Sequence, residues 1–113
     1  MIVRNLTQTT ILSQKTEVAD AFFSRMGGLL GRAAFLPGEA LVITQCNSIH
    51  MFFMKFPIDA VFIDSKWKVV GLVRNILPNR LSPVFWHADR VIELPAGTID
   101  STRTSLGDTL QIG

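Results

Sequence analysis

The sequence predicts a small, mainly β protein: an antiparallel, partly closed barrel or rolled sheet of about seven short strands, with one N-terminal helix packed on it. Three observations support this fold class. Apolar runs of strand length recur at close spacing, turn-forming residues separate them, and only one segment has a helical spacing of apolar residues. Alternating βαβ units are disfavoured, because each parallel pair of strands would need its own crossover.

The length and composition fit one compact domain. The chain has 113 residues, of which 48% are hydrophobic and 18% are charged. A chain of this size buries roughly 65% of the surface that it exposes when unfolded. We therefore expect residues 1–113 to form a single folded domain, present as a monomer or a small homo-oligomer.

The charge distribution and cysteine content exclude several classes of partner and location. The net charge is only +2, and the eleven basic residues are scattered along the chain, which argues against nucleic acid. A single cysteine cannot form an internal disulfide, so nothing requires an oxidising compartment. Because there is no signal-like N-terminus and no run of about 20 apolar residues, we expect no membrane association and a cytoplasmic location.

Seven strands are expected from apolar and β-branched runs that are bounded by turn residues. In chain order they are Ile2–Leu6, Thr10–Ser13, Ala40–Gln45, Ile58–Ile63, Val69–Val73, Arg90–Leu94 and Thr109–Ile112. The turn at residues 64–68 predicts a hairpin of the fourth and fifth strands. Two prolines should keep the segment 77–83 outside any sheet.

One helix is expected to begin at Thr16, which is a suitable N-cap. Its apolar residues would recur four positions apart, at Val18, Phe22 and Met26. The pair of glycines that starts at Gly27 would end it.

The densest group of distinctive side chains lies between Cys46 and Asp59, including the only cysteine and one of two histidines. On an extended segment alternate residues share a face, which places Phe53 with Ile49 and Met51. The other face would mix polar and apolar groups, as a binding pocket does. We therefore predict a binding or accessory module, for a small molecule or a protein, with a pocket or groove bordered by Ser48 to Asp59. The expected ligand-binding residues are Ser48, His50, Phe52, Met54 and Asp59, with Arg25 and Arg32 as cations from the helix end.

Two other functions are compatible with the same residues. A small enzyme would use His50 and Asp59, with or without Cys46, as acid–base groups. A metal site would use Cys46, His50 and Met54, which have the order of a blue-copper ligand loop. However, residues four apart on a strand are about 13 Å apart, whereas metal ligands lie within about 2.3 Å of the ion. We assign no metal and no cofactor.

Several of these residues also have a purely structural interpretation. His50 is suited to hold its loop in shape through a hydrogen bond. Glu93 lies between two apolar residues of a strand, so its side chain is expected on a solvated face. Phe85-Trp86-His87 fits either a cap on the barrel or an exposed anchor for a partner. The phenylalanines of the 46–59 segment are expected in the core; if several are exposed, they form a partner-binding patch instead.

Several blocks of the sequence match one known family in order and spacing. They are Arg25-x-x-Gly28-Leu29-Leu30-x-Arg32, then Ser48-Ile49-His50-x-Phe52-Phe53-Met54-x-Phe56-Pro57-Ile58-Asp59-x-Val61-Phe62-Ile63-Asp64, then Val91-Ile92-Glu93-Leu94-Pro95-Ala96-Gly97, and Gly107-Asp108. From about residue 25 to the C-terminus the chain resembles the domain of unknown function 192 family. The resemblance implies a small β-rich domain that is widespread in bacteria and archaea. It brings no established activity, so it assigns no catalytic residue.

Overall fold

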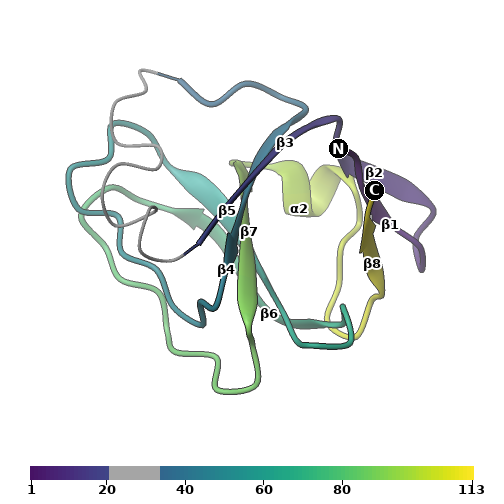
Figure 1. The fold of residues 1–113 in the computed structure, drawn as a ribbon. Coiled ribbons are helices and arrows are strands. Elements are labelled where there is room, and N and C mark those ends of the chain that lie inside the picture. Colours follow the sequence, from purple (N-terminus) through teal and green to yellow (C-terminus); the bar gives the residue numbers. More distant parts are fainter. Residues whose placement is uncertain (21–33) are drawn as a thin grey trace.

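The protein is built from two β-sheets, and its computed structural model describes residues 1–20 and 34–113. The larger sheet has the strand order β3-β4-β7-β5-β6, with β3 at Lys15–Asp20, β4 at Glu39–Thr44, β7 at Arg90–Pro95, β5 at Ile58–Ile63 and β6 at Val69–Ile76. The smaller sheet has the order β2-β1-β8, with β2 at Thr10–Ser13, β1 at Val3–Asn5 and β8 at Leu110–Ile112. The smaller sheet brings both termini to one side of the molecule (Figure 1).

The predicted fold class is confirmed. The seven predicted strands correspond to the described strands other than β3, and β5 and β6 form the expected antiparallel hairpin. In the hairpin turn the Asp64 carboxylate accepts the backbone N–H groups of Lys68 and Lys66, and these bonds hold the pKa of Asp64 below its usual value. Among the described strands β3 and β6 form the edges of the larger sheet, so that sheet does not close into a barrel.

The prediction of a helix that begins at Thr16 is wrong for the first turn of that helix. Lys15–Asp20 is strand β3, and it pairs in parallel with β4, from Lys15 opposite Glu39 to Asp20 opposite Thr44. A spacing of four residues fits both the helical period and the two-residue period of a strand, so the apolar pattern did not distinguish them. The rest of the expected helix, residues 21–26, lies outside the described residues. The described helix is the single turn α2 at Thr98–Ser101, which is too short to show a period.

The core lies on both faces of the larger sheet. All six residues of β5 are buried, with alternate residues on opposite faces. Val61 and Ile63 face α2 and the smaller sheet, in a cluster that also contains Leu12, Ile99 and Leu110. Ile58, Ala60 and Phe62 face the other way, in a cluster with Ile49, Met51 and Val91. The sheet is therefore covered on both sides, which explains the continuous apolar character of its central strands.

Asp59 is the one charged residue of β5, and it ties three elements together. Its side chain is 1% exposed. One carboxylate oxygen accepts the backbone N–H groups of Gly97 and Ile99 at 3.1 and 2.9 Å, and the other accepts that of Asn75 at 2.8 Å. The carboxylate thus fixes the turn that leads into α2 and the end of β6 against β5.

Replacement of Asp59 by Asn should destabilise the fold by about 2–3 kcal/mol, because an amide has only one acceptor oxygen for the three backbone N–H groups that the buried carboxylate accepts. Urea denaturation of the variant and the wild type measures the difference. Asp100→Asn is the matched control: Asp100 forms an exposed ion pair with Arg74 at 2.9 Å, and its loss should cost less than about 1 kcal/mol. Equal effects of the two substitutions would contradict a structural role for Asp59.

Candidate functional site

Two loops run together along the side of the molecule opposite the termini (Figure 1). Residues 47–54 lie before β5 and residues 79–86 lie after β6, and we call them the loop pair. The backbones of the two loops are bonded along their length: Met51 N to Arg80 O at 2.8 Å, Asn79 N to Met51 O at 2.7 Å, Ser82 N to Ile49 O at 2.9 Å and Phe85 N to Asn47 O at 2.9 Å. The loop pair is therefore an extension of the β structure with a defined backbone.

Side chains from both loops anchor the loop pair to the sheet. Ile49 and Met51 are 9% and 1% exposed and belong to the core cluster of that face. Phe85 packs on Phe62 of β5 with ring centroids 4.5 Å apart. Gly71 of β6 makes room for this ring, because a Cβ atom there would lie 2.3 Å from the Phe85 side chain.

The outer side of the loop pair carries an unusual number of exposed apolar side chains. Phe53 is 81% exposed and Trp86 is 82% exposed. The others are Phe52, Leu81 and Val84, at 42%, 67% and 43%. Isolated apolar residues are common on protein surfaces, whereas these five are carried by two hydrogen-bonded loops. The segment 85–87 was expected either to cap the β structure or to be exposed. Phe85 packs on the sheet, as a cap would, whereas Trp86 is exposed.

Phe53 points outward because of the backbone around it. Its φ is +64°, a conformation that is rare for a large side chain and costs on the order of 1 kcal/mol or more. The turn is closed by Met54 N, which donates to Met51 O at 3.3 Å, and by Phe53 N, which donates to the Asn79 side chain at 3.3 Å. The expectation that Phe53 lies in the core is therefore wrong.

The structure brings together only part of the predicted ligand-binding set. The expected alternation holds from Ser48 to Phe52: Ser48 is half-buried, His50 is exposed, and the rings of His50 and Phe52 stack with centroids 5.2 Å apart. Cys46 and Met54 instead pack against the core below the loops, and the Cys46 thiol donates to the Ser48 carbonyl at 3.0 Å. Arg25 and Arg32 lie outside the described residues.

Asp59 lies on the other side of the sheet from His50. Its carboxylate points to the face that carries α2, whereas the loop that contains His50 packs on the opposite face through Ile49 and Met51. Both carboxylate oxygens of Asp59 accept backbone N–H groups. Within residues 1–20 and 34–113, no group of three or more His, Cys, Asp or Glu side chains is arranged to hold a metal ion.

Glu93 corrects a prediction and adds a buried ionisable group. It was expected on a solvated face, but it is 7% exposed. In β7 it lies between Leu41 of β4 and Ala60 of β5. Strand alternation correctly predicted that the Glu93 side chain points away from Ile92 and Leu94. The error was to assume that this face of the sheet is exposed to solvent. Burial raises the pKa of Glu93 from 4.5 to about 7.

The stability of the fold should therefore depend on pH through Glu93. The group is protonated in both states well below its ordinary pKa of 4.5 and has no effect there. Between pH 4.5 and about 7 the unfolded chain ionises while the folded one keeps its proton, so stability falls as the pH rises. Above that range the cost is constant, on the order of 3 kcal/mol.

Replacement of Glu93 by Gln removes this titration. We expect the unfolding free energy of Glu93→Gln, relative to the wild type, to increase by on the order of 3 kcal/mol between about pH 4 and pH 8. Denaturation curves of both proteins across the pH range measure it. A constant difference between the two proteins would show that Glu93 does not titrate in this range in the folded state.

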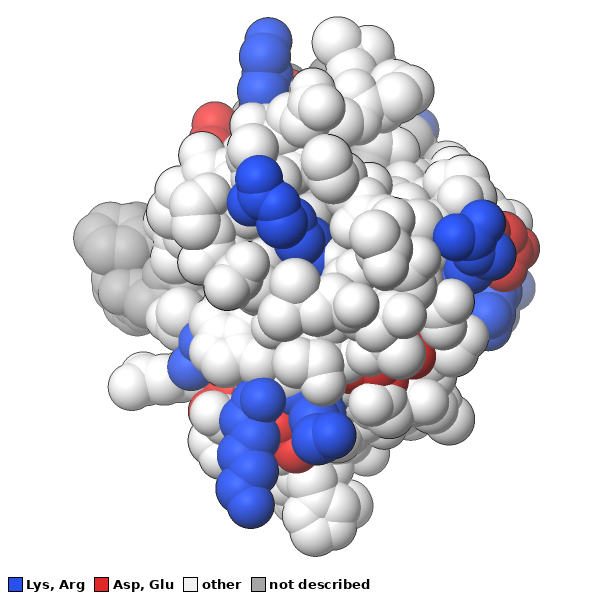
Figure 2. Space-filling model, turned by 90° about the vertical axis from the view of Figure 1, so that its right-hand side faces the viewer, with Lys and Arg blue, Asp and Glu red and all other residues white. Residues whose placement is uncertain are grey.

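The two loops of the pair contain no acidic side chain. Residues 45–57 and 77–88 contain no Asp or Glu, and their Lys55 and Arg80 are exposed. Asp89 follows directly; its side chain is 40% exposed and lies 3.1 Å from Arg90. The face that carries the termini differs, because acidic and basic side chains both occur there with uncharged areas between them (Figure 2). The loop pair thus combines exposed apolar side chains with the cation of Arg80 and has no acidic side chain of its own.

The fold is similar to that of proteins of known structure, and the sequence is similar to that of several relatives. A protein of unknown function from Novosphingobium aromaticivorans matches with a TM-score of 0.83 at 17% identity, over 98% of this chain and 82% of that one. The UPF0127 protein of Thermococcus sibiricus is 36% identical over 94% of this chain and 71% of its own length. The UPF0127 protein PH1112 of Pyrococcus horikoshii is 35% identical over 86% of each chain.

The fold and the sequence together define the class: a small, open, two-sheet β domain of an uncharacterised family. The family model of domain of unknown function 192, described as an uncharacterised ACR, matches residues 3–112, and the chain belongs to this family. The match begins well before residue 25, where the resemblance was expected to start. No helix within the described part of the chain has the length and apolar character needed to cross a membrane.

Proposed function

We propose that this protein is a non-catalytic binding module, and that the loop pair docks a segment of a partner protein that carries apolar side chains flanked by acidic ones. The observation behind the proposal is the exposure of Phe53 and Trp86, above 80% each, on loops with a hydrogen-bonded backbone. Large aromatic side chains contribute most of the energy at many protein interfaces. Because the loop backbone is already ordered, docking would cost little conformational entropy.

The charges of the loop pair indicate which charges the partner segment should carry. Arg80 lies within the loop pair, Lys55 directly follows its first loop, and neither loop contains Asp or Glu. The loop pair therefore complements a segment that has acidic residues beside aromatic or aliphatic ones. The exposed charges should act mainly on the association rate and be screened by salt, whereas the apolar contacts should persist.

The enzymatic alternative has less support. Acid–base catalysis by His50 and Asp59 needs the two groups within hydrogen-bond reach of one reacting molecule. Asp59 is buried on the α2 face with its oxygens bonded to backbone N–H groups, and His50 is on the opposite side of the sheet. Ring stacking with Phe52 makes His50 a component of the apolar surface.

A defined set of peptides tests the proposal. Four fluorescent peptides of equal length are compared by anisotropy: acidic with aromatic residues, neutral with the same aromatics, basic with the same aromatics, and acidic without aromatics. We expect the first to bind most tightly, the neutral one more weakly, and the last two least. Tightest binding of the basic aromatic peptide, or no binding by any of the four, would contradict the proposal.

Substitutions test whether the peptide binds on the loop pair. Trp86→Ser and Phe53→Ser should each raise the Kd of the acidic aromatic peptide by at least about tenfold, equivalent to about 1.4 kcal/mol. Leu106→Ser is the matched control, because Leu106 is 66% exposed and lies outside the loop pair. An equal effect of Leu106→Ser would contradict the assignment. Sedimentation should find a monomer; a dimer that Trp86→Ser dissociates would make a second copy the occupant and overturn the proposed partner.

A further inference from the structure

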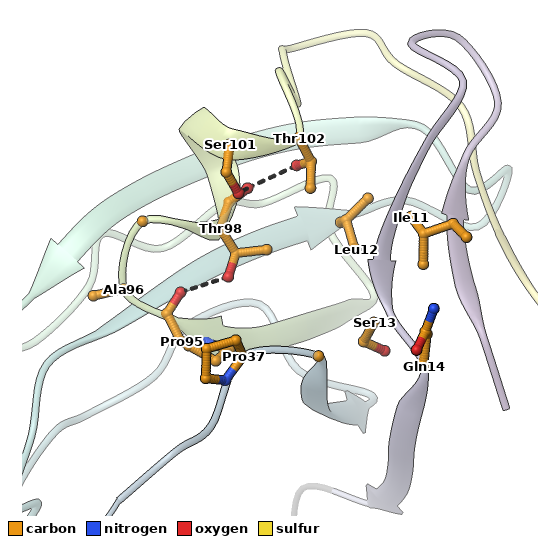
Figure 3. A pocket seen from close by; sticks show the side chains of 12 residues that line it. Ile11, Leu12, Ser13, Gln14, Pro37, Pro95, Ala96, Thr98, Ser101 and Thr102 are labelled. Atoms are coloured by element: carbon orange, nitrogen blue, oxygen red, sulfur yellow. Dashed lines mark hydrogen bonds between the residues drawn. The ribbon is translucent and has the colours of Figure 1, made fainter.

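A hollow of about 410 Å³ lies beside α2 (Figure 3). Three parts of the chain form its walls: the end of β2, the turn before β4, and the segment from the end of β7 through α2. Its volume is within the range of pockets that hold small molecules. No local sequence pattern predicts this hollow, because the three wall segments are far apart in the chain.

The walls of the hollow are tied to one another. The Gly38 carbonyl accepts the backbone N–H groups of Gln14 and Lys15, both at 2.9 Å, which joins the turn before β4 to the end of β2. On the other side Asp59 fixes Gly97 and Ile99. The hollow is therefore a preformed feature of the fold.

The lining of the hollow is neutral. None of its twelve residues is Lys, Arg, His, Asp or Glu. Pro37, Pro95 and Leu12 supply apolar surface, and the rest of the lining includes hydroxyl and amide side chains. A charged ligand would lose hydration without gaining an ionic partner here, so the lining favours a neutral one.

The hydroxyl groups of α2 present acceptors to the hollow. Thr98 donates its proton to the Pro95 carbonyl at 2.8 Å, a bond that is drawn in Figure 3. Ser101 donates to the Thr98 carbonyl at 3.2 Å. With their protons used inside the protein, these oxygens offer lone pairs to a ligand, which must then bring donors. Gln14 adds an amide that both donates and accepts.

We propose that this hollow binds a small neutral molecule with several hydroxyl groups, of the size of a monosaccharide. Its hydroxyl protons are donated to Thr98 and Ser101, one hydroxyl pairs with the Gln14 amide, and its C–H surface packs on the two proline rings. The site is independent of the loop pair.

NMR titration tests the site. Protein labelled with ¹⁵N is titrated with glucose, galactose and mannose, and separately with the charged analogues glucosamine and glucuronate. At least one neutral hexose should shift the amide signals of Gln14, Gly38, Thr98 and Ser101 saturably, with a Kd of about 1 mM or below. The charged analogues should bind more weakly. Absence of a saturable shift with all three neutral hexoses, or equal binding of a charged analogue, would overturn the proposal.

Two variants and a control locate the binding. Ser101→Trp fills the hollow from an exposed position and should abolish the shifts, and Gln14→Leu should weaken binding several-fold. Ser65→Trp makes the same change at an exposed position in the β5–β6 turn and should bind as the wild type does. Thermal unfolding verifies that each variant is folded. Undiminished binding by a folded Ser101→Trp variant would place the ligand elsewhere and refute this site.

Discussion

The rest of the structure depends on the complete burial of β5. Each of its six residues is enclosed, so both faces of the larger sheet must be covered. The smaller sheet and α2 cover one face, and the loop pair with its anchoring side chains covers the other. The single carboxylate of β5 is tolerated because three backbone N–H groups satisfy it. That carboxylate also places the turn before α2, and hence one wall of the hollow.

Coverage of the second face explains why the loops are ordered and why they also expose apolar side chains. Met51 and Phe85 point inward and bury apolar surface of the sheet. The outward residues have no such role: the fold gains little from Phe53 or Trp86, and Phe53 adopts a costly backbone conformation. A surface that is costly to the isolated domain is reasonable if a partner covers it.

The sequence was informative wherever one residue pattern had one physical interpretation. Apolar runs between turn residues identified seven strands, and Ile58–Ile63 was placed at its observed bounds. The pattern failed at Thr16 because its spacing fits two periods, and at Glu93 because alternation does not reveal whether a face is covered. The turn at Phe53 depends on a bond to Asn79 from a distant loop, and the hollow joins three segments. No local pattern records such contacts.

Hydrogen exchange tests the central claim that the loop pair is a rigid surface built onto the sheet. The amides of Met51, Asn79, Ser82 and Phe85 are bonded between the loops, so their protection should approach that of the β5 amides. The amide of Trp86, on the same loop pair, is the internal comparison and should exchange faster. Exchange of all four bonded amides at the rate of an open loop would show that Phe53 and Trp86 are carried by flexible segments, and would contradict the account.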